Sequence, residues 1–216
     1  MSIEYNIADI RKEYKLKSFL ESEALLNPID QFAKWWDEAA TSKIEEYNAM
    51  TICTCSLSGK PSARIVLLKG FSEEGFIFYT NYNSRKGREI LENPDVAIVF
   101  FWKELERQIR IEGKAMKTNE MISDAYFDSR PLGSKIGALS SPQSTIIPSR
   151  DYLEVKQKEI ANLYSNKGIK RPDHWGGFII KPELFEFWQG RPSRLHDRIE
   201  YVPAENNSWS RRRLAP

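Results

Sequence analysis

The feature that most constrains the fold of this chain is a series of short apolar runs with strand character. Between residues 49 and 116 these runs are separated by turn signals such as Ser58-Gly59-Lys60-Pro61 and Pro94-Asp95, and no long helical pattern lies between them. Parallel strands need long crossover connections, whereas antiparallel strands need only a tight turn. The sequence therefore predicts a mainly β protein with helices (α+β), whose antiparallel sheet curls into a small barrel.

Helices are predicted around these strands. Asn27 can cap a helix in which Pro28 occupies the first position and Asp30 complements the helix dipole. Further helices are predicted at residues 85–91 after the cap Ser84, at residues 118–129 with Thr118 as cap, and at residues 133–139 and 151–164. Residues 1–26 are expected to form a partly mobile arm, and residues 27–216 a single domain.

The stretch from Arg64 to Lys86 combines apolar runs with cations. Ile65–Leu68 and Phe76–Tyr79 are predicted to form a largely buried hairpin. The cations at its borders are Arg64, Lys69, Arg85 and Lys86. An unpaired charge beside apolar strands favours an anionic partner, and the Ser84-capped helix start would add free N–H groups. The residues outline a phosphate site, although a solvated surface would give the same pattern.

Two further clusters suggest anion or ring binding. Strand alternation would place Arg194, His196 and Arg198 on one face, although an exposed edge strand would leave them solvated. Tyr126 and Arg130 lie four residues apart on a predicted helix and so share a face. With Ser134 beyond Pro131 they could bind one phosphate together, whereas a capped helix with a surface arginine explains Arg130 alone.

Composition excludes several classes of protein. The formal net charge of +2, from 32 basic and 30 acidic residues, argues against a surface that binds nucleic acid or coats a membrane. The first residues mix acids and bases without a signal-like apolar run, so a cytoplasmic protein is expected. Cys53 and Cys55 are expected to be buried reduced thiols, and with two His in the chain no metal site is expected.

Several segments resemble one enzyme family in its own order. RIVLLK and FYTNYNSRKG, the Y-F-x-S-R-P pattern from Tyr126, and Phe187-Trp188-Gln189-Gly190 followed by RLHDR resemble the pyridoxine/pyridoxamine 5'-phosphate oxidases. The resemblance runs from about Asn27 to the last residue. It implies an FMN-binding split β-barrel and a homodimer with the flavin between subunits. The implied reaction converts pyridoxine 5'-phosphate or pyridoxamine 5'-phosphate to pyridoxal 5'-phosphate with dioxygen, in vitamin B6 metabolism.

The resemblance also implies roles for individual residues. FMN would be held by Arg64, Lys69, Tyr79, Thr80, Arg85, Lys86, Gln108, Gln143, Ser144, Trp188 and Arg198. The substrate would be held by Lys69, Tyr126, Arg130, Ser134, Arg194, His196, Arg11 and Tyr14, with Arg194 and His196 as the catalytic residues against the pyridine ring. Leu132 and Lys135 depart from the family pattern without touching an implied ligand.

Other functions compete with this interpretation. A split-barrel flavin reductase or oxidase of another substrate need not retain Tyr126, Arg130, Ser134 and the RLH segment together. A non-catalytic carrier of flavin or pyridoxal phosphate would retain the binding residues alone. An RNA-binding module would use Trp35, Trp36 and the basic tail 211–213, but the near-neutral charge and the lack of a stacking motif oppose it.

Overall fold

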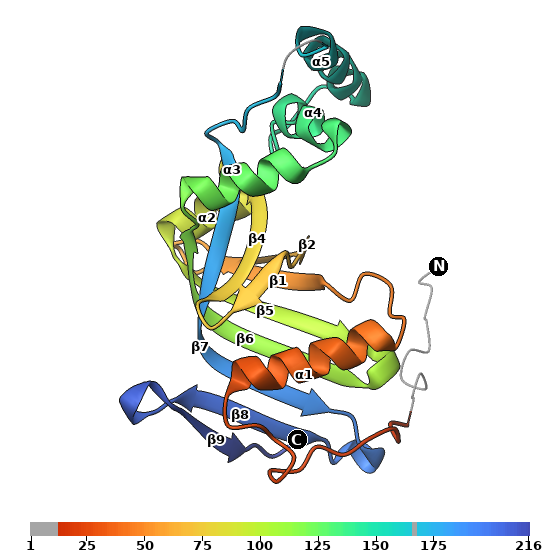
Figure 1. Ribbon diagram of the computed structural model, residues 1–216, viewed down its shortest axis with the longest axis vertical. Helices are drawn as coiled ribbons and strands as arrows, with labels where there is room; N and C mark the ends of the chain where they lie inside the picture. Colours follow the sequence, from red (N-terminus) through yellow and green to blue (C-terminus); the bar gives the residue numbers. More distant parts are fainter. Residues whose placement is uncertain (1–12, 166–167) are drawn as a thin grey trace, which may run out of the picture. The chain divides into compact units, whose positions relative to one another are not determined.

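The computed structural model of the protein describes residues 13–165 and 168–216 (Figure 1). Its helices are α1 (Pro28–Thr41), α2 (Arg85–Glu92), α3 (Glu120–Ser129), α4 (Leu132–Ser140) and α5 (Arg150–Leu163), with short 3-10 turns η1 (Lys103–Leu105), η2 (Pro192–Arg194) and η3 (Glu205–Asn207). Its strands are β1 (Ala49–Cys55), β2 (Pro61–Leu67), β3 (Gly70–Ser72), β4 (Gly75–Asn81), β5 (Asp95–Trp102), β6 (Arg107–Lys117), β7 (Trp175–Gln189), β8 (Asp197–Pro203) and β9 (Trp209–Arg213). The predictions for Arg11 and for the arm before residue 13 lie outside the described residues.

The strands join in one sheet with the order β2-β1-β5-β6-β7-β4-β3, and β8 and β9 continue from β7 as a hairpin (Figure 1). The pairs β1–β2, β1–β5, β3–β4, β4–β7, β7–β8 and β8–β9 are all antiparallel. The prediction of an antiparallel sheet with accompanying helices is thus confirmed. β7 is long enough to pair with both β4 and β8 at different parts of its length.

The described chain divides into two compact units, and β5, β6 and β7 contribute residues to both. The first unit holds the residues up to Tyr47 together with Phe100–Arg110 and Leu184–Pro216. Its core forms on α1, where the ring of Trp35 lies edge-on to Phe187 at 5.3 Å between centroids. Phe19, from the segment before α1, is 3% exposed, and its N–H donates to a carboxylate oxygen of Asp197.

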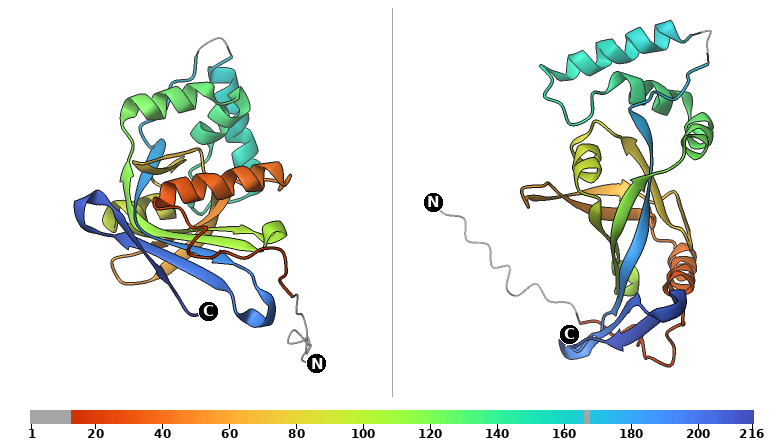
Figure 2. Two further views of the ribbon diagram at one scale, coloured as in Figure 1. Left: turned by 60° about the horizontal axis from the view of Figure 1, so that its bottom comes forward. Right: turned by 90° about the vertical axis from the view of Figure 1, so that its left-hand side faces the viewer.

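The second unit holds Asn48–Val99 and Ile111–Glu183 and carries helices α2 to α5. α4 and α5 pack against each other (Figure 2). A buried cluster of Phe127, Ile136, Ile169 and Trp175 joins the ends of α3 and α4 to the start of β7. This cluster fixes the helices beside the carboxyl end of β4, where Tyr79 packs against it.

The predicted hairpin of Ile65–Leu68 with Phe76–Tyr79 is wrong. β2 pairs with β1 along its whole length, and β4 takes its hairpin partner from the short strand β3. Each of these pairings follows a tight turn with a glycine at positive φ. Between β1 and β2 the Ser56 carbonyl accepts from the N–H of Gly59, at a φ of +77°, and between β3 and β4 Gly75, at a φ of +137°, stands opposite Ser72. β2 is also less buried than predicted, because the Ile65 side chain is 64% exposed.

The predicted helix caps are mostly confirmed. Asn27 caps α1 and Ser84 caps α2, each through a side-chain oxygen that accepts a backbone N–H. The predicted cap of α3 is wrong by one residue, since Asn119 rather than Thr118 accepts the N–H of Ile122. The Thr118 hydroxyl instead contacts Ser123 and the Gly177 carbonyl.

The thiols also differ from expectation. Cys53 and Cys55 are free, as expected, but half-buried rather than buried. Both lie on the more exposed face of β1, whose buried face carries Met50, Ile52 and Thr54.

A close approach of β6 and β7 gives a test of the second unit. A Cβ at Gly113 would lie 2.1 Å from the Lys181 carbonyl oxygen, so Gly113→Ala must shift backbone. We expect a loss of about 1 to 3 kcal/mol in the free energy of unfolding, measured by denaturant titration. Gly133→Ala in α4 is the control, because nothing lies within 4 Å of a Cβ there and a gain of roughly 0.4 to 1 kcal/mol is expected. Equal effects of the two substitutions would contradict the packing.

Candidate functional site

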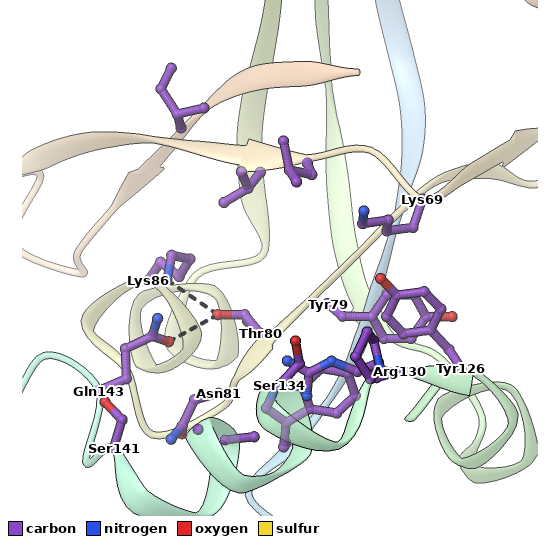
Figure 3. A pocket seen from close by; sticks show the side chains of 17 residues that line it. Lys69, Tyr79, Thr80, Asn81, Lys86, Tyr126, Arg130, Ser134, Ser141 and Gln143 are labelled. Atoms are coloured by element: carbon purple, nitrogen blue, oxygen red, sulfur yellow. Dashed lines mark hydrogen bonds between the residues drawn. The ribbon is translucent and has the colours of Figure 1, made fainter. Parts of the chain in front are cut away.

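An open pocket of about 670 Å³ lies in the second unit (Figure 3). Its wall includes these residues predicted from the sequence: Lys69, Tyr79, Thr80, Lys86, Tyr126, Arg130, Ser134 and Gln143. Strand β4, helix α2, the end of α3 and helix α4 supply most of them. Among the lining residues that the structure describes there are three cations and no carboxylate, so the pocket carries positive charge without an acidic counterpart.

Lys86 marks one side of the pocket. Its side chain is buried, and its ammonium donates to the Thr80 hydroxyl at 3.2 Å, while that hydroxyl donates to the Gln143 amide oxygen at 3.2 Å (Figure 3). No ion pair of Lys86 occurs within residues 13–165 and 168–216. Burial lowers the pKa of Lys86, and the charge of Arg64 lowers it further. A buried ammonium in this setting is stabilised by an anion.

Arg130 marks the other side, near Lys69, Tyr79 and Tyr126 (Figure 3). The chain leaves helix α3 at Arg130, whose φ of −72° and ψ of 146° are the extended values favoured before a proline. The Nη1 atom of Arg130 is buried without a hydrogen-bond partner. Burial lowers the pKa of its guanidinium, against the opposing effect of Tyr126. The half-buried Arg130 side chain lines the pocket and, together with the exposed Lys69 and the Ser134 hydroxyl, fits a phosphate group.

Arg64 and Arg85 do not line this pocket. Each interacts instead with Glu89, which the sequence analysis missed: Arg85 Nε donates to Glu89 Oε1 at 2.8 Å, and Arg64 Nη2 lies 3.5 Å from Glu89 Oε2. The hydroxyls of Thr54 and Ser62 donate to the same carboxylate. The expected anionic partner of these two arginines is therefore present within the chain. The spacing of four residues between Arg85 and Glu89 was the available signal.

Ser144 also lies outside the pocket wall. It is exposed and has a φ of +67°, in the left-handed region that few residues other than glycine adopt. Its neighbour Gln143 does line the pocket, so the predicted Gln143-Ser144 pair is split.

The first unit gathers another set of predicted residues. The rings of Tyr14, Trp188 and His196 form one cluster, with 4.6 Å between the centroids of Trp188 and His196 and 5.7 Å between those of Tyr14 and Trp188. The backbone N–H of Arg191 donates to Nδ1 of His196 at 3.1 Å. Burial lowers the pKa of His196, as does the charge of Arg194, whereas Asp197 raises it.

The predicted strand through Arg194, His196 and Arg198 is wrong. Pro192–Arg194 is a 3-10 turn, and β8 begins only at Asp197. Ser193 and Arg194 have φ values of +55° and +61°, so alternation along a strand does not describe them. Pro192 lacks the N–H that a strand would need, which favours the turn. Arg194 is exposed, while Arg198 lies in β8.

Arg198 belongs to a charged group in the first unit. Arg198 Nε donates to Glu186 Oε1 at 2.8 Å, and Arg110 Nη2 donates to Glu186 Oε2 at 2.8 Å. Burial would raise the pKa of Glu186, but the hydrogen bonds from Arg198 and Arg110 outweigh it and lower that pKa. Gln108 lies half-buried on β6 in the same unit.

Two features are absent from the part of the chain that the structure describes. No group of three or more His, Cys, Asp or Glu side chains within residues 13–165 and 168–216 could hold a metal ion. No helix of that part of the chain is long and apolar enough to cross a membrane.

Comparison with known proteins identifies the family. The family model described as "Pyridoxamine 5'-phosphate oxidase" matches residues 36–164. The chain belongs to the pyridoxine/pyridoxamine 5'-phosphate oxidase family. A second model, "Pyridoxine 5'-phosphate oxidase C-terminal dimerisation region", matches residues 175–216. The resemblance inferred from the sequence is thus confirmed, and the chain is an oxidoreductase of this family.

Named relatives of the family cover nearly the whole chain. The pyridoxine/pyridoxamine 5'-phosphate oxidase of Trichormus variabilis is 52% identical over 97% of this chain and 98% of its own length. That of Bordetella petrii is 50% identical over 98% of this chain and 100% of its own length.

Solved structures confirm the fold. PhzG from Burkholderia lata, solved with tetrahydrophenazine-1-carboxylic acid, has a TM-score of 0.84 at 28% identity and covers 90% of this chain and 95% of its own. A pyridoxamine 5'-phosphate oxidase-related, FMN-binding protein of Nostoc punctiforme has a TM-score of 0.69 at 16% identity and covers 88% of this chain and 98% of its own. The predicted split-barrel fold is therefore confirmed.

Glu89 makes stability depend on pH. Burial would raise the pKa of this carboxyl, but hydrogen bonds from Ser62, Thr54 and Arg85 outweigh it and lower the pKa to about 2. A carboxyl group whose pKa is lower in the folded state than in the unfolded state stabilises the fold at pH values above its unfolded-state pKa. That stabilisation is lost as the pH falls through the folded-state pKa. We expect Glu89→Gln to lower the free energy of unfolding most above about pH 5, with the difference from wild type shrinking between pH 4.5 and about 2.

The matched control is Glu92→Gln, which removes an exposed carboxylate from the same helix. Urea titrations of all three proteins across this pH range measure the effect. A Glu89→Gln penalty that stays constant from neutral pH to about pH 2 would contradict the ionic role of Glu89.

Proposed function

We propose that this chain uses FMN to oxidise pyridoxine 5'-phosphate or pyridoxamine 5'-phosphate to pyridoxal 5'-phosphate, with dioxygen as the electron acceptor. The names of its 50% and 52% identical relatives support this substrate class. The observation in the structure that carries the proposal is the pocket of the second unit. Its described wall holds Lys69, Lys86 and Arg130 without a carboxylate, which suits ligands that bear phosphate groups.

The chemistry of this donor set fits FMN together with a phosphorylated substrate. Lys86, Thr80 and Gln143 would contact the flavin, since the buried ammonium of Lys86 has an uncompensated charge. Arg130, Lys69 and Ser134 would bind the substrate phosphate, since all three line the pocket and no carboxylate does so among the described residues. When bound, FMN supplies the hydride acceptor, and the residues of the chain bind and orient the reactants.

The remaining residue assignments stay predictions. The proposal assigns Tyr79, Arg64, Arg85, Ser144, Gln108, Trp188 and Arg198 to the flavin, and Tyr126, Tyr14, Arg194, His196 and Arg11 to the substrate, with the catalytic role on Arg194 and His196. The gathering of Tyr14, Trp188 and His196 into one ring cluster supports a shared role for these three. The Glu89 partnership implies that Arg64 and Arg85 would meet a flavin phosphate while sharing one carboxylate.

A homodimer belongs to the same proposal. Residues 175–216 match a region described as a dimerisation region, which supports assembly of two copies. We propose that the partner subunit helps to enclose the flavin, as the family resemblance implies. We propose a cytoplasmic location for the protein, and we propose no nucleic-acid or membrane partner.

A second candidate is a flavin enzyme with another substrate. The structural similarity to PhzG, which was solved with tetrahydrophenazine-1-carboxylic acid, favours it, since that ligand is not a phosphate ester. The identity to PhzG is 28%, against 52% to the Trichormus variabilis oxidase. A cation pair such as Lys69 and Arg130 beside the Ser134 hydroxyl fits a phosphate dianion better than a lone carboxylate.

The function is tested by purification, a visible spectrum and anaerobic addition of pyridoxamine 5'-phosphate. We expect a yellow protein with non-covalent FMN whose flavin absorbance bleaches on addition of the substrate and returns with air. A colourless protein that FMN does not reconstitute would contradict the cofactor assignment. A flavin that remains oxidised with both vitamin B6 phosphates would favour the second candidate.

Arg130→Ala tests the division of the pocket. We expect it to weaken substrate binding by on the order of 1.5 to 3 kcal/mol, because a charge-assisted contact to the phosphate is lost, while flavin content is unchanged. KM, kcat and the ratio of FMN to protein measure the two effects. Arg150→Ala, which removes an exposed arginine of α5, is the control and should change neither. A variant that lost flavin but kept its KM would show that the two phosphate positions are assigned the wrong way.

A further inference from the structure

Trp175 was absent from the residues predicted from the sequence, yet it lies on the pocket wall against Arg130. The Cζ atom of Arg130 is 4.5 Å from the centroid of the indole ring and 5.6 Å from the centroid of the Phe127 ring. Both distances are within the range in which an aromatic face attracts a cation, and tryptophan is the strongest of these faces. Arg130 has no carboxylate partner among the described residues, so its charge is stabilised by cation–π contacts with the two rings.

The sheet fixes the position of Trp175. It is the first residue of β7, stands opposite Asn81 of β4 and is 6% exposed. In the same antiparallel pair, two residues from Trp175 along β7, Gly177 stands opposite Tyr79 of β4. A Cβ at Gly177 would lie 2.9 Å from Cε1 of Tyr79. The missing side chain leaves room for the Tyr79 ring, which lies nearly parallel to Trp175 at 9° and 5.6 Å.

Helix α3 holds the other side of this arrangement. The ring of Tyr126 stacks on Tyr79 at 3.8 Å between centroids and lies at 4° to the plane of Trp175. α3 ends three residues after Tyr126, so Arg130 leaves the helix beside rings that are already fixed. An arginine held in this way loses little conformational freedom when a ligand arrives.

The kind of partner matters for what Arg130 can bind. A carboxylate would hold the guanidinium equally well, but it would occupy the N–H donors and cancel the charge, as Glu89 does for Arg85. An aromatic face attracts the cation through its π electrons and leaves the in-plane donors available. Nη1 of Arg130 is buried and has no hydrogen-bond partner, so the donors that can reach a ligand are those that the half-buried guanidinium keeps at the pocket wall.

We propose that Trp175 is a positioning residue, which holds the Arg130 guanidinium by its π face so that the free donors bind the phosphate of the substrate. Trp175 thereby sets the preference of the pocket for phosphorylated over unphosphorylated ligands. This inference rests on the proposed function, because it takes the phosphate at Arg130 to be that of the substrate.

The experiment measures the binding of two ligands to the FMN-loaded protein through the change in flavin absorbance. One ligand is a pyridoxine 5'-phosphate analogue that lacks the oxidisable 4'-hydroxyl, and the other is the same analogue without its phosphate. The variants are Trp175→Leu, which removes the π face, and Trp175→Phe, which keeps a weaker one. Trp35→Leu is the matched control, because Trp35 is also buried and has Arg107 over its ring at 4.2 Å, but does not line the pocket.

We expect Trp175→Leu to lower the preference for the phosphorylated analogue about 10-fold, which corresponds to about 1.4 kcal/mol, and Trp175→Phe to lower it about 3-fold. Binding of the unphosphorylated analogue and of FMN should stay within about 2-fold of wild type, and Trp35→Leu should keep the wild-type preference. In an Arg130→Ala background Trp175→Leu should have no further effect on the preference, because its action passes through Arg130.

Two results would overturn the inference and leave the proposed function intact: an unchanged preference in Trp175→Leu, or an equal loss of preference in Trp35→Leu. A persistent effect of Trp175→Leu without Arg130 would also overturn it. A wild-type protein that binds FMN but does not prefer the phosphorylated analogue would contradict the proposed substrate class itself.

Discussion

Uncompensated positive charge at the wall of one pocket links the fold of this protein to its proposed function. Lys86 is buried beside hydroxyl and amide groups, and Arg130 is held against aromatic rings, so neither cation meets a carboxylate among the described residues. Burying an ammonium or a guanidinium in this way costs free energy, and the binding of an anion offsets that cost. The fold tolerates the cost because sheet pairing and the aromatic cluster around Phe127 and Trp175 fix the surrounding backbone independently.

The arginines of the second unit have two kinds of partner, a carboxylate or an aromatic ring. Arg64 and Arg85 share the buried Glu89 carboxylate, which also accepts hydrogen bonds from the hydroxyls of Thr54 and Ser62. Arg130 receives π faces instead and keeps its donors. The first type of pairing stabilises the start of α2 against β1 and β2, and the second stores binding capacity for a ligand. The same kind of side chain thus meets a carboxylate of the chain in one place and lines a ligand pocket without one in the other.

The sequence predicted what depends on neighbouring residues and missed what depends on pairing between distant ones. The caps Asn27 and Ser84 follow from a few adjacent side chains, and the apolar runs gave most strands their correct places. The pairing of β2 with β1, and of β4 with β3, depends on the turns at Gly59 and Gly75, and the apolar runs alone do not specify it. The family resemblance assigned Lys69, Lys86, Tyr126 and Arg130 to ligand binding, and all four line the pocket. Trp175 escaped notice because its place beside Arg130 follows from the register of β7 against β4.

We infer that one pocket binds two phosphates at separate positions, one near Lys86 and the other at Arg130. A crystal structure of the protein with FMN and a non-oxidisable pyridoxine 5'-phosphate analogue tests it most directly. We expect the analogue's phosphate to lie within hydrogen-bond distance of Arg130 and Ser134, and the flavin to contact Lys86 or Thr80. A flavin phosphate bound to Arg130, or an analogue whose phosphate lies away from Arg130 in solvent, would contradict it.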